Sequence, residues 1–263
     1  MYPILLHIWG PFAVHSYGTM IALGALLSLH LGMRDKKLMG LTTYNQLINL
    51  VTVMIVSGVI GGRLLFIIEN WHNLHSFYDM INITDAGFSL LGTVTVSSFA
   101  VIAYLKIHKL NILSIADRIG IYIPLLYSIS RIGCFLAGCC YGIPTTSACT
   151  PWAITYTNTD VFAPCFEPLH PTQLYSSLNA LVIFLFMYFA QEKLCKKRGQ
   201  LIGCFFFLIG LERFSVDFFR ANRIMISIIL STSQMIALVC IGVGVALFGI
   251  ATYTTWFTNS AEK

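Results

Sequence analysis

Long apolar stretches recur along almost the whole chain, and they limit what it can fold into. A helix that crosses a bilayer needs roughly 20 mostly apolar residues. The segments that meet this need are Phe12–Gly32, Leu47–Ile68, Gly87–Ile107, Ile119–Leu136, Thr172–Ala190, Leu201–Phe219 and Ile228–Trp256. Only 10% of the residues are charged, against about 25% in soluble domains. The sequence therefore predicts an all-α polytopic membrane protein with about seven transmembrane helices, in which residues 1–263 form a single transmembrane domain.

Lysine and arginine gather in alternate loops, and this pattern predicts the orientation of the chain. Cytoplasmic loops carry an excess of these residues. The loops after the first, third and fifth segments are basic, whereas residues 69–86 and 142–171 contain neither lysine nor arginine. We therefore expect the N-terminus outside and the C-terminus inside. The first residues of the chain lack a basic stretch, so a cleaved signal peptide is not expected.

Charged residues inside two of the segments predict a functional site. Arg131 interrupts the fourth segment within SRIGCFLAGCCYG, and a charge at bilayer depth usually faces a partner or a polar cavity. A guanidinium binds phosphate oxygens with two hydrogen bonds, so an anionic lipid head group would suit it. On the sixth segment, Arg213 and Asp217 are four residues apart and share a helix face. With Arg220, they form either a structural ladder of ion pairs or a cationic track along a lipid-filled cavity, and we favour the cavity.

Three arginines lie near the outer ends of the segments. Arg220 and Arg223 break the orientation pattern, because they follow the sixth segment on the side expected to be outside. They are either tolerated exceptions at a helix end or ligands of lipid phosphate. Arg63 follows two glycines in Gly61–Arg63. Those glycines allow close helix packing, and the arginine either extends to the lipid head groups or binds substrate.

Two histidines and two tyrosines lie at the start of predicted segments. His15 and Tyr17 belong to VHSYG, and His170 and Tyr175 belong to HPTQLY. A histidine titrates near neutral pH and can act as a base, but it can equally be a hydrogen-bonded residue at the interface. The tyrosines are either site residues or members of an aromatic belt.

The cysteines of the outer region have several possible roles. Cys149 and Cys165 both lie in the loop expected outside, where disulfides persist, and we predict a disulfide between them. Cys134, Cys139 and Cys140 cluster at the outer end of the fourth segment. They can pair with the loop cysteines, pack as small residues or act as a nucleophile. The cluster has no C-x-x-C spacing, which argues against a redox enzyme.

Five motifs in a fixed order carry a family resemblance. They are VHSYG at 14–18, GGR at 61–63, RIGCFLAGCCYG at 131–142, HPTQLY at 170–175 and RFSVDFFR at 213–220. In order and spacing the chain resembles the bacterial prolipoprotein diacylglyceryl transferase family, from about residue 10 to residue 240. The resemblance implies a seven-helix enzyme of the bacterial inner (cytoplasmic) membrane. Such an enzyme moves the diacylglyceryl group of phosphatidylglycerol onto the lipobox cysteine thiol of a prolipoprotein and releases glycerol phosphate.

The resemblance also implies roles for individual residues. Catalysis is assigned to Arg131, Arg213, His15 and Tyr17. Substrate binding is assigned to Arg220, Arg63, Gly133, Gly138, His170, Gln173, Tyr175 and Gln234. The implied partners are phosphatidylglycerol, a prolipoprotein and membrane lipids, without nucleic acid. No cofactor is implied, and no metal is predicted, because His72 and His75 have no evident third ligand.

The chain departs from the family pattern at four positions. Leu91 stands where the family often has a histidine, Ser176 where it often has a glutamate, Cys134 where some members have an asparagine, and Ile209 where it has a tyrosine. These departures leave two alternatives beside the transferase. One is a paralogue that transfers a phospholipid-derived group to another acceptor. The other is a non-catalytic lipid-binding membrane protein.

Overall fold

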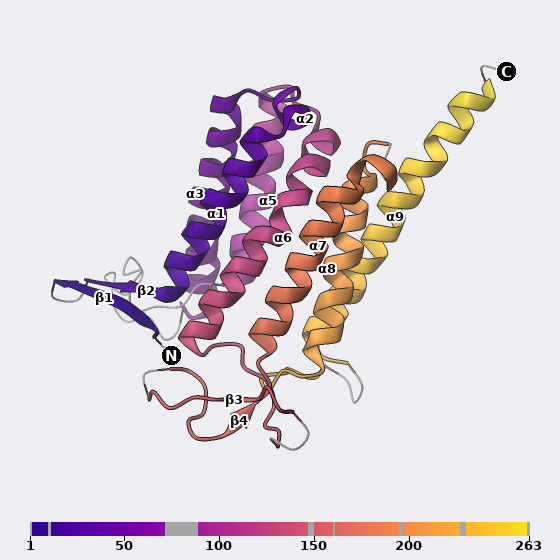
Figure 1. The fold of residues 1–263 in the computed structure, drawn as a ribbon. Helices are drawn as coiled ribbons and strands as arrows, with labels where there is room; N and C mark the ends of the chain where they lie inside the picture. The colour runs from indigo at the N-terminus through magenta and orange to yellow at the C-terminus, as the bar shows by residue number, and fades with distance from the viewer. Residues whose placement is uncertain are drawn as a thin grey trace. The chain divides into compact units, whose positions relative to one another are not determined.

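Seven long helices and two short hairpins make up the part of the chain that the structure describes (Figure 1). A computed structural model describes residues 2–9, 12–71, 89–146, 150–159, 161–194, 197–226 and 230–261. The long helices are α1 (Ser16–Arg34), α3 (Tyr44–Glu69), α5 (Leu90–Ile107), α6 (Ile112–Ala137), α7 (Thr172–Leu194), α8 (Gln200–Asp217) and α9 (Thr232–Ala261). A single turn, α2 (Lys36–Met39), follows α1.

Each long helix overlaps one predicted segment, which confirms a mostly helical membrane protein. Five of these helices, α1, α3, α6, α7 and α9, are long and apolar enough to cross a membrane. Helix α5 is shorter in its apolar part, Leu91–Ile107, and α8 carries Glu212, Arg213 and Asp217 within 18 residues. The multi-pass architecture is therefore confirmed, while the number of seven spans stays a prediction.

The first helix begins later than predicted. The segment was expected to start at Phe12, but Phe12–His15 forms strand β2, which pairs antiparallel with β1 (Ile4–Trp9). Helix α1 begins at Ser16, whose backbone N–H and hydroxyl both donate to the carbonyl of Pro3, at 2.9 and 3.1 Å. Pro3, which precedes β1, thus accepts both hydrogen bonds of the buried Ser16 at the start of α1. The β1–β2 hairpin takes the place of the first helical turn that hydropathy alone predicts.

A second hairpin lies where α6 ends and α7 begins (Figure 1). It pairs β3 (Ile154–Thr155) with β4 (Pro168–Leu169). Tyr156, Val161 and Leu169 form a small buried core beneath it. This loop therefore has a fixed structure of its own, which positions the residues that follow it in HPTQLY.

The chain divides into two compact units. The second unit, Lys36–Ile115, is continuous and holds α3 and α5. A Cβ atom added at Gly61 would lie 2.6 Å from the carbonyl oxygen of Gly92, so only glycine allows these two backbones to approach so closely. The close packing predicted for the glycines of Gly61–Arg63 is confirmed. The prediction of one domain over residues 1–263 stays a prediction.

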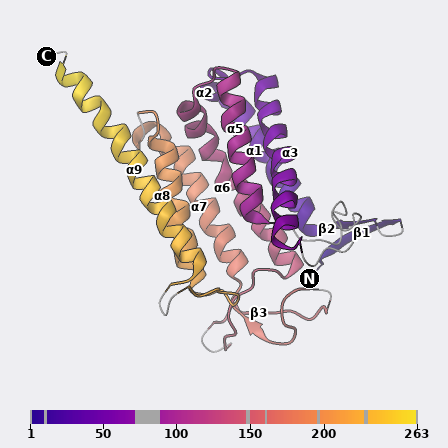
Figure 2. The ribbon, with the colours of Figure 1, turned by 180° about the vertical axis from the view of Figure 1, so that it is seen from behind.

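The first unit joins Met1–Asp35 to Ala116–Lys263. In it α6, α7, α8 and α9 lie side by side in this order (Figures 1 and 2). Buried apolar side chains of α6, α7 and α8 form its main core: Ile121, Tyr122, Leu125, Ile183, Phe184, Met187, Leu201, Ile202 and Phe205. Helix α1 packs on α6, where a Cβ atom added at Gly133 would lie 3.0 Å from the Cβ of Met20.

A buried carboxylate of α6 caps the start of α8. Asp117 is 5% exposed and accepts hydrogen bonds from the backbone N–H groups of Gly199, at 2.6 Å, and Ile202, at 2.8 Å. The first N–H groups of a helix have no partner within the helix, and a negative charge at this end is favourable. Asp117 therefore fixes the position of α8 along α6.

Replacing Asp117 with alanine is expected to lower the free energy of unfolding by about 2–4 kcal/mol, because two buried N–H groups lose a charged acceptor. Equilibrium unfolding in mixed micelles measures this loss. Asn111→Ala is the matched control, since Asn111 caps α6 with one bond to the N–H of Ser114 and should cost only about 1 kcal/mol. Equal losses in the two variants would contradict the role given to Asp117.

Candidate active site

Backbone hydrogen bonds bring three of the sequence motifs together at one end of the first unit. The N–H of Gly142 donates to the carbonyl of His170 at 3.0 Å, and the N–H of Ile143 donates to that of Phe219 at 2.9 Å. A Cβ atom added at Gly142 would lie 2.5 Å from the first of these oxygens and 2.7 Å from the second. The end of the signature run is thus held between the start of α7 and the end of α8, and this convergence could not be seen in the sequence.

Arg131 lies on α6 near this convergence, with part of its guanidinium unused. Its Nη2 donates to the hydroxyl of Tyr127 at 2.8 Å, and the group stacks over the Tyr127 ring at 4.6 Å. Its Nε is buried and has no hydrogen-bond partner among the described residues. No ion pair involving Arg131 occurs among them either. A cation with a buried donor that has no partner is suited to an anionic ligand.

A buried glutamate completes this arrangement from α8. Glu212 is 5% exposed, and its Oε2 lies 3.5 Å from the hydroxyl of Tyr127. The hydroxyl of Ser176 lies beside the same carboxylate. Ser176 is the position where the family resemblance implies a glutamate, so in this chain α8 supplies a carboxylate next to the residue that lacks one. Residue spacing along one helix could not have predicted this contact between α7 and α8.

The second predicted arginine takes part in an ion-pair network at the start of α9. Arg213 Nη2 lies 3.9 Å from Asp217 Oδ1 and donates to the hydroxyl of Ser233 at 2.9 Å. Asp217 also pairs with Arg223 at 3.4 Å and accepts from the hydroxyl of Ser231. The shared helix face predicted for Arg213 and Asp217 is confirmed, and the ion-pair interpretation holds for these two residues.

The remaining arginine of this motif has an unused donor. The Nε of Arg220 is buried without a hydrogen-bond partner among the described residues. Arg213 lies within electrostatic range of both Arg131 and Arg220. The cavity expected beside Arg131 and Arg220 stays a prediction.

Two residues predicted to bind substrate make hydrogen bonds that hold the loops in place. Gln173, 1% exposed, donates to the carbonyl of Cys139 at 2.7 Å and to the hydroxyl of Tyr156 at 3.2 Å. Burial raises the pKa of Tyr156 to about 12, so this hydroxyl stays protonated. Gln234 is fully buried, accepts from Arg223 at 3.1 Å and accepts from the N–H of Ser231 at the start of α9. These contacts are structural, and the predicted substrate contacts stay predictions.

His170 and Tyr175 form an aromatic cluster with Phe219. The Nδ1 of His170 lies 3.1 Å from the hydroxyl of Tyr175, which also accepts from Trp152 Nε1 at 2.7 Å. The rings of His170 and Phe219 are 5.3 Å apart. The structure therefore favours the interpretation of His170 as a hydrogen-bonded residue beside the site.

The two catalytic residues predicted on α1 differ in their surroundings. The backbone of Tyr17 touches α6, since a Cβ atom added at Gly133 would lie 3.1 Å from the Cα of Tyr17. The Tyr17 hydroxyl lies within electrostatic range of Arg131. His15 is exposed, precedes the first turn of α1 and makes no side-chain capping bond there. Gly138, which ends α6, has a φ of +72°, a left-handed conformation that favours glycine.

The other predicted positions do not belong to the three converging motifs. Arg63 is buried in the second unit, with its guanidinium 5.3 Å from the centre of the Phe66 ring. Leu91 belongs to the same unit and is 64% exposed in the first turn of α5. His72 and His75 lie outside the described residues.

The structure describes one of the two cysteines of the disulfide predicted in the outer loop. Cys165 is a free thiol that donates to the carbonyl of Asn158 at 3.3 Å. Its expected partner, Cys149, lies outside the described residues. The β3–β4 core holds this loop without a covalent link to Cys165.

Comparison with known proteins decides the family. The family model described as prolipoprotein diacylglyceryl transferase matches residues 3–250. The chain belongs to the prolipoprotein diacylglyceryl transferase family. Among the similar proteins of this family is the phosphatidylglycerol–prolipoprotein diacylglyceryl transferase of Clostridium tetani. It is 34% identical over 252 residues, which cover 95% of this chain and 98% of the relative.

Two other members of the diacylglyceryl transferase family show the same extent of similarity. The phosphatidylglycerol–prolipoprotein diacylglyceryl transferase 2 of Clostridium perfringens is 32% identical over 90% of this chain and 91% of its own length. One of Dehalococcoides mccartyi is 28% identical over 91% of this chain and 90% of its own length. The similarity therefore extends over both compact units and is not confined to the motifs.

Proposed function

We propose that this protein transfers the diacylglyceryl group of phosphatidylglycerol to the lipobox cysteine of a prolipoprotein. Family membership over residues 3–250 supports this reaction. The observation that carries the proposal is the pair of buried, unused guanidinium donors on Arg131 and Arg220. They lie where the signature run, HPTQLY and RFSVDFFR converge. Such donors suit the phosphate that must leave in this reaction.

The proposed chemistry is a displacement at the glyceryl carbon. The acceptor thiol loses its proton, since the thiolate is the nucleophile. The sulfur then attacks the carbon in line with the phosphate, which depends on positioning. The sulfur–carbon bond forms as the carbon–oxygen bond breaks, and glycerol phosphate leaves. Arg131 and Arg213 hold the charge that develops on the phosphate, with Arg220 as a further ligand.

We also propose that all seven long helices cross the bacterial inner membrane, with the N-terminus outside. Helix α8 has 18 residues, about 27 Å at 1.5 Å per residue, which is close to the roughly 30 Å of a hydrocarbon core. In the first unit, Arg34, Lys193 and Lys197 lie at the helix ends opposite the three converging motifs. Since basic residues favour the cytoplasm, the site belongs at the outer face.

Complementation tests the proposed reaction. A bacterial strain depleted of its own transferase is given this gene, and the thioether lipid on a reporter lipoprotein is measured by mass spectrometry. We expect the reporter to be lipidated. A well-expressed membrane protein that leaves the reporter unmodified would overturn the proposal and favour a paralogue with another acceptor.

Tyr127→Phe is expected to lower the initial rate of transfer about 10-fold, because Arg131 and Glu212 lose the hydroxyl between them. The phenyl ring keeps the stacking contact, so the fold should be unchanged. The rate is measured with purified enzyme, phosphatidylglycerol vesicles and a lipobox peptide. Tyr253→Phe is the control, since Tyr253 is 69% exposed on α9. A rate equal to that of the control would show that the hydroxyl does not position Arg131.

A further inference from the structure

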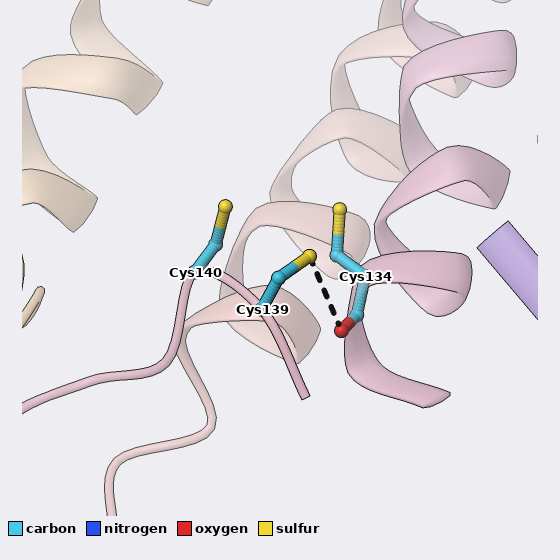
Figure 3. A group of neighbouring side chains, drawn as sticks. All are labelled: Cys134, Cys139 and Cys140. Carbon is cyan, nitrogen blue, oxygen red and sulfur yellow. Dashed lines mark hydrogen bonds between the residues drawn. The ribbon is translucent and has the colours of Figure 1, made fainter. Parts of the chain in front are cut away.

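Three cysteine thiols gather at the end of α6 (Figure 3). Cys134 comes from the last turns of the helix, and Cys139 and Cys140 come from the chain that follows it. All three sulfur atoms lie within 4.8 Å of one another, and all three thiols are free. The reaction proposed above uses the thiol of the acceptor and gives no task to these three.

The backbone holds the three thiols together. The N–H of Cys139 donates to the carbonyl of Cys134 at 3.1 Å. The carbonyl of Cys139 accepts from Gln173 at 2.7 Å, and that of Cys140 accepts from Thr172 at 2.8 Å. Both donors come from buried side chains of HPTQLY. Cys140 has a φ of +60°, a conformation that is uncommon for residues other than glycine. The cluster is therefore a fixed arrangement, maintained by a second motif.

The spacing suits a thiophilic metal ion. With metal–sulfur bonds of about 2.3 Å, the sulfur atoms around a tetrahedral or trigonal ion lie about 3.8–4.0 Å apart. The three sulfur atoms, all within 4.8 Å of one another, are at most about 1 Å farther apart than this geometry requires. Thiolate ligands select soft or borderline ions such as Zn²⁺. Arg131 Nη1 lies 3.9 Å from the Cys134 sulfur, and Arg220 lies within electrostatic range of Cys140. These cations offset the negative charge of three thiolates.

Three ligands leave one position of a tetrahedral ion open. Structural zinc sites are closed by four protein ligands, whereas catalytic sites have three and take water or substrate in the fourth position. Among the described residues, only these three belong to a group of cysteine, histidine, aspartate or glutamate side chains close enough to hold one ion. The acceptor in the proposed reaction is itself a thiol, which is a ligand of the same kind.

We infer that Cys134, Cys139 and Cys140 bind one Zn²⁺-like ion, whose open position takes the acceptor thiol of the prolipoprotein. This inference rests on the proposed function. On binding, the acceptor thiol releases its proton to water, because a metal-bound thiol is deprotonated. Its sulfur then forms the bond to the glyceryl carbon while the bond from carbon to phosphate breaks. The neutral thioether leaves the metal, and no oxidant or reductant is needed.

Cobalt spectroscopy on the purified full chain tests the metal site without relying on activity. The reduced protein, in detergent micelles, is titrated with Co²⁺, whose thiolate complexes absorb in the visible range. We expect one Co²⁺ per chain with tetrahedral bands, and displacement by Zn²⁺. Cys134→Ser, Cys139→Ser and Cys140→Ser should each weaken binding by about 100-fold or more, since even outer-shell partners cost 10–100-fold. Cys240→Ser is the matched control, because it removes a cysteine of α9 that does not belong to the cluster.

A lipobox peptide tests the open position. Adding the peptide to the Co²⁺ form should shift the bands, and a peptide with serine in place of the cysteine should not. The absence of stoichiometric Co²⁺ binding, binding that survives the three serine variants, a disulfide within the cluster or unshifted bands would each overturn the inference. Lipidation is measured separately by complementation. Lipidation that is retained in all three serine variants would overturn the metal role while leaving the proposed transferase intact.

Discussion

Arg131→Ala is expected to lower the rate of diacylglyceryl transfer by about 100- to 1,000-fold, the usual cost of removing a preorganised donor from a developing negative charge. The structure gives the reason: the Nε of Arg131 is buried and unused among the described residues, while Tyr127 fixes the rest of the group. The rate with purified enzyme and a lipobox peptide measures the loss, and mass spectrometry confirms the thioether product.

Arg131→Lys separates charge from geometry. Lysine keeps the positive charge but cannot bind phosphate through two parallel bonds or stack flat on Tyr127, so we expect a loss between those of wild type and Arg131→Ala. Arg118→Ala is the control on the same helix, since Arg118 pairs with Asp35 at 3.8 Å and lies at the other end of α6. An Arg131→Ala enzyme within threefold of this control would remove Arg131 from the mechanism.

Gly142→Ala is expected to abolish most of the transfer and to lower the yield of folded protein. The added methyl group would meet the carbonyl oxygens of His170 and Phe219 at 2.5 and 2.7 Å. Both oxygens belong to backbone, which cannot move aside without breaking the bonds that join the motifs. The activity per folded molecule and the unfolding transition in micelles should both fall.

Gly242→Ala is the matched control for this substitution. Gly242 lies on α9, and a Cβ atom added there meets nothing within 4 Å. Alanine favours a helix over glycine by about 1 kcal/mol, so this variant should be as stable as the wild type or more so. If Gly142→Ala behaved like Gly242→Ala, the motifs would not need their close approach.

Much of the helical framework could be predicted from the sequence, because apolar runs report helices directly. Errors arose where short-range contacts compete with hydropathy. Phe12–His15 pairs with an upstream strand instead of extending α1. The pairing of Arg213 with Asp217 was predictable, since four residues along one helix place two side chains together.

The chemistry of the site was less predictable, because it depends on contacts between distant segments. Glu212 lies beside Ser176 only because α7 and α8 are neighbours. The cysteine cluster requires a left-handed residue at Cys140 and two side chains from HPTQLY. The sequence places these cysteines together at the end of the fourth segment, but it does not predict a metal there. The loop-holding hydrogen bonds of Gln173 and Gln234 were also not predictable, because a motif does not distinguish a ligand from a residue that holds a loop.

The division of the chain into a continuous and a discontinuous unit predicts an order of assembly. Helix α1 is synthesised first, yet its partner surface on α6, at Gly133, emerges only after the whole second unit, Lys36–Ile115, has been made. Domains generally fold as units during synthesis, so α3 and α5 can pair while α1 waits in the bilayer without its partner. Arg213 lies on α8 and Arg220 follows it, so we expect a chain truncated before α8 to be inactive.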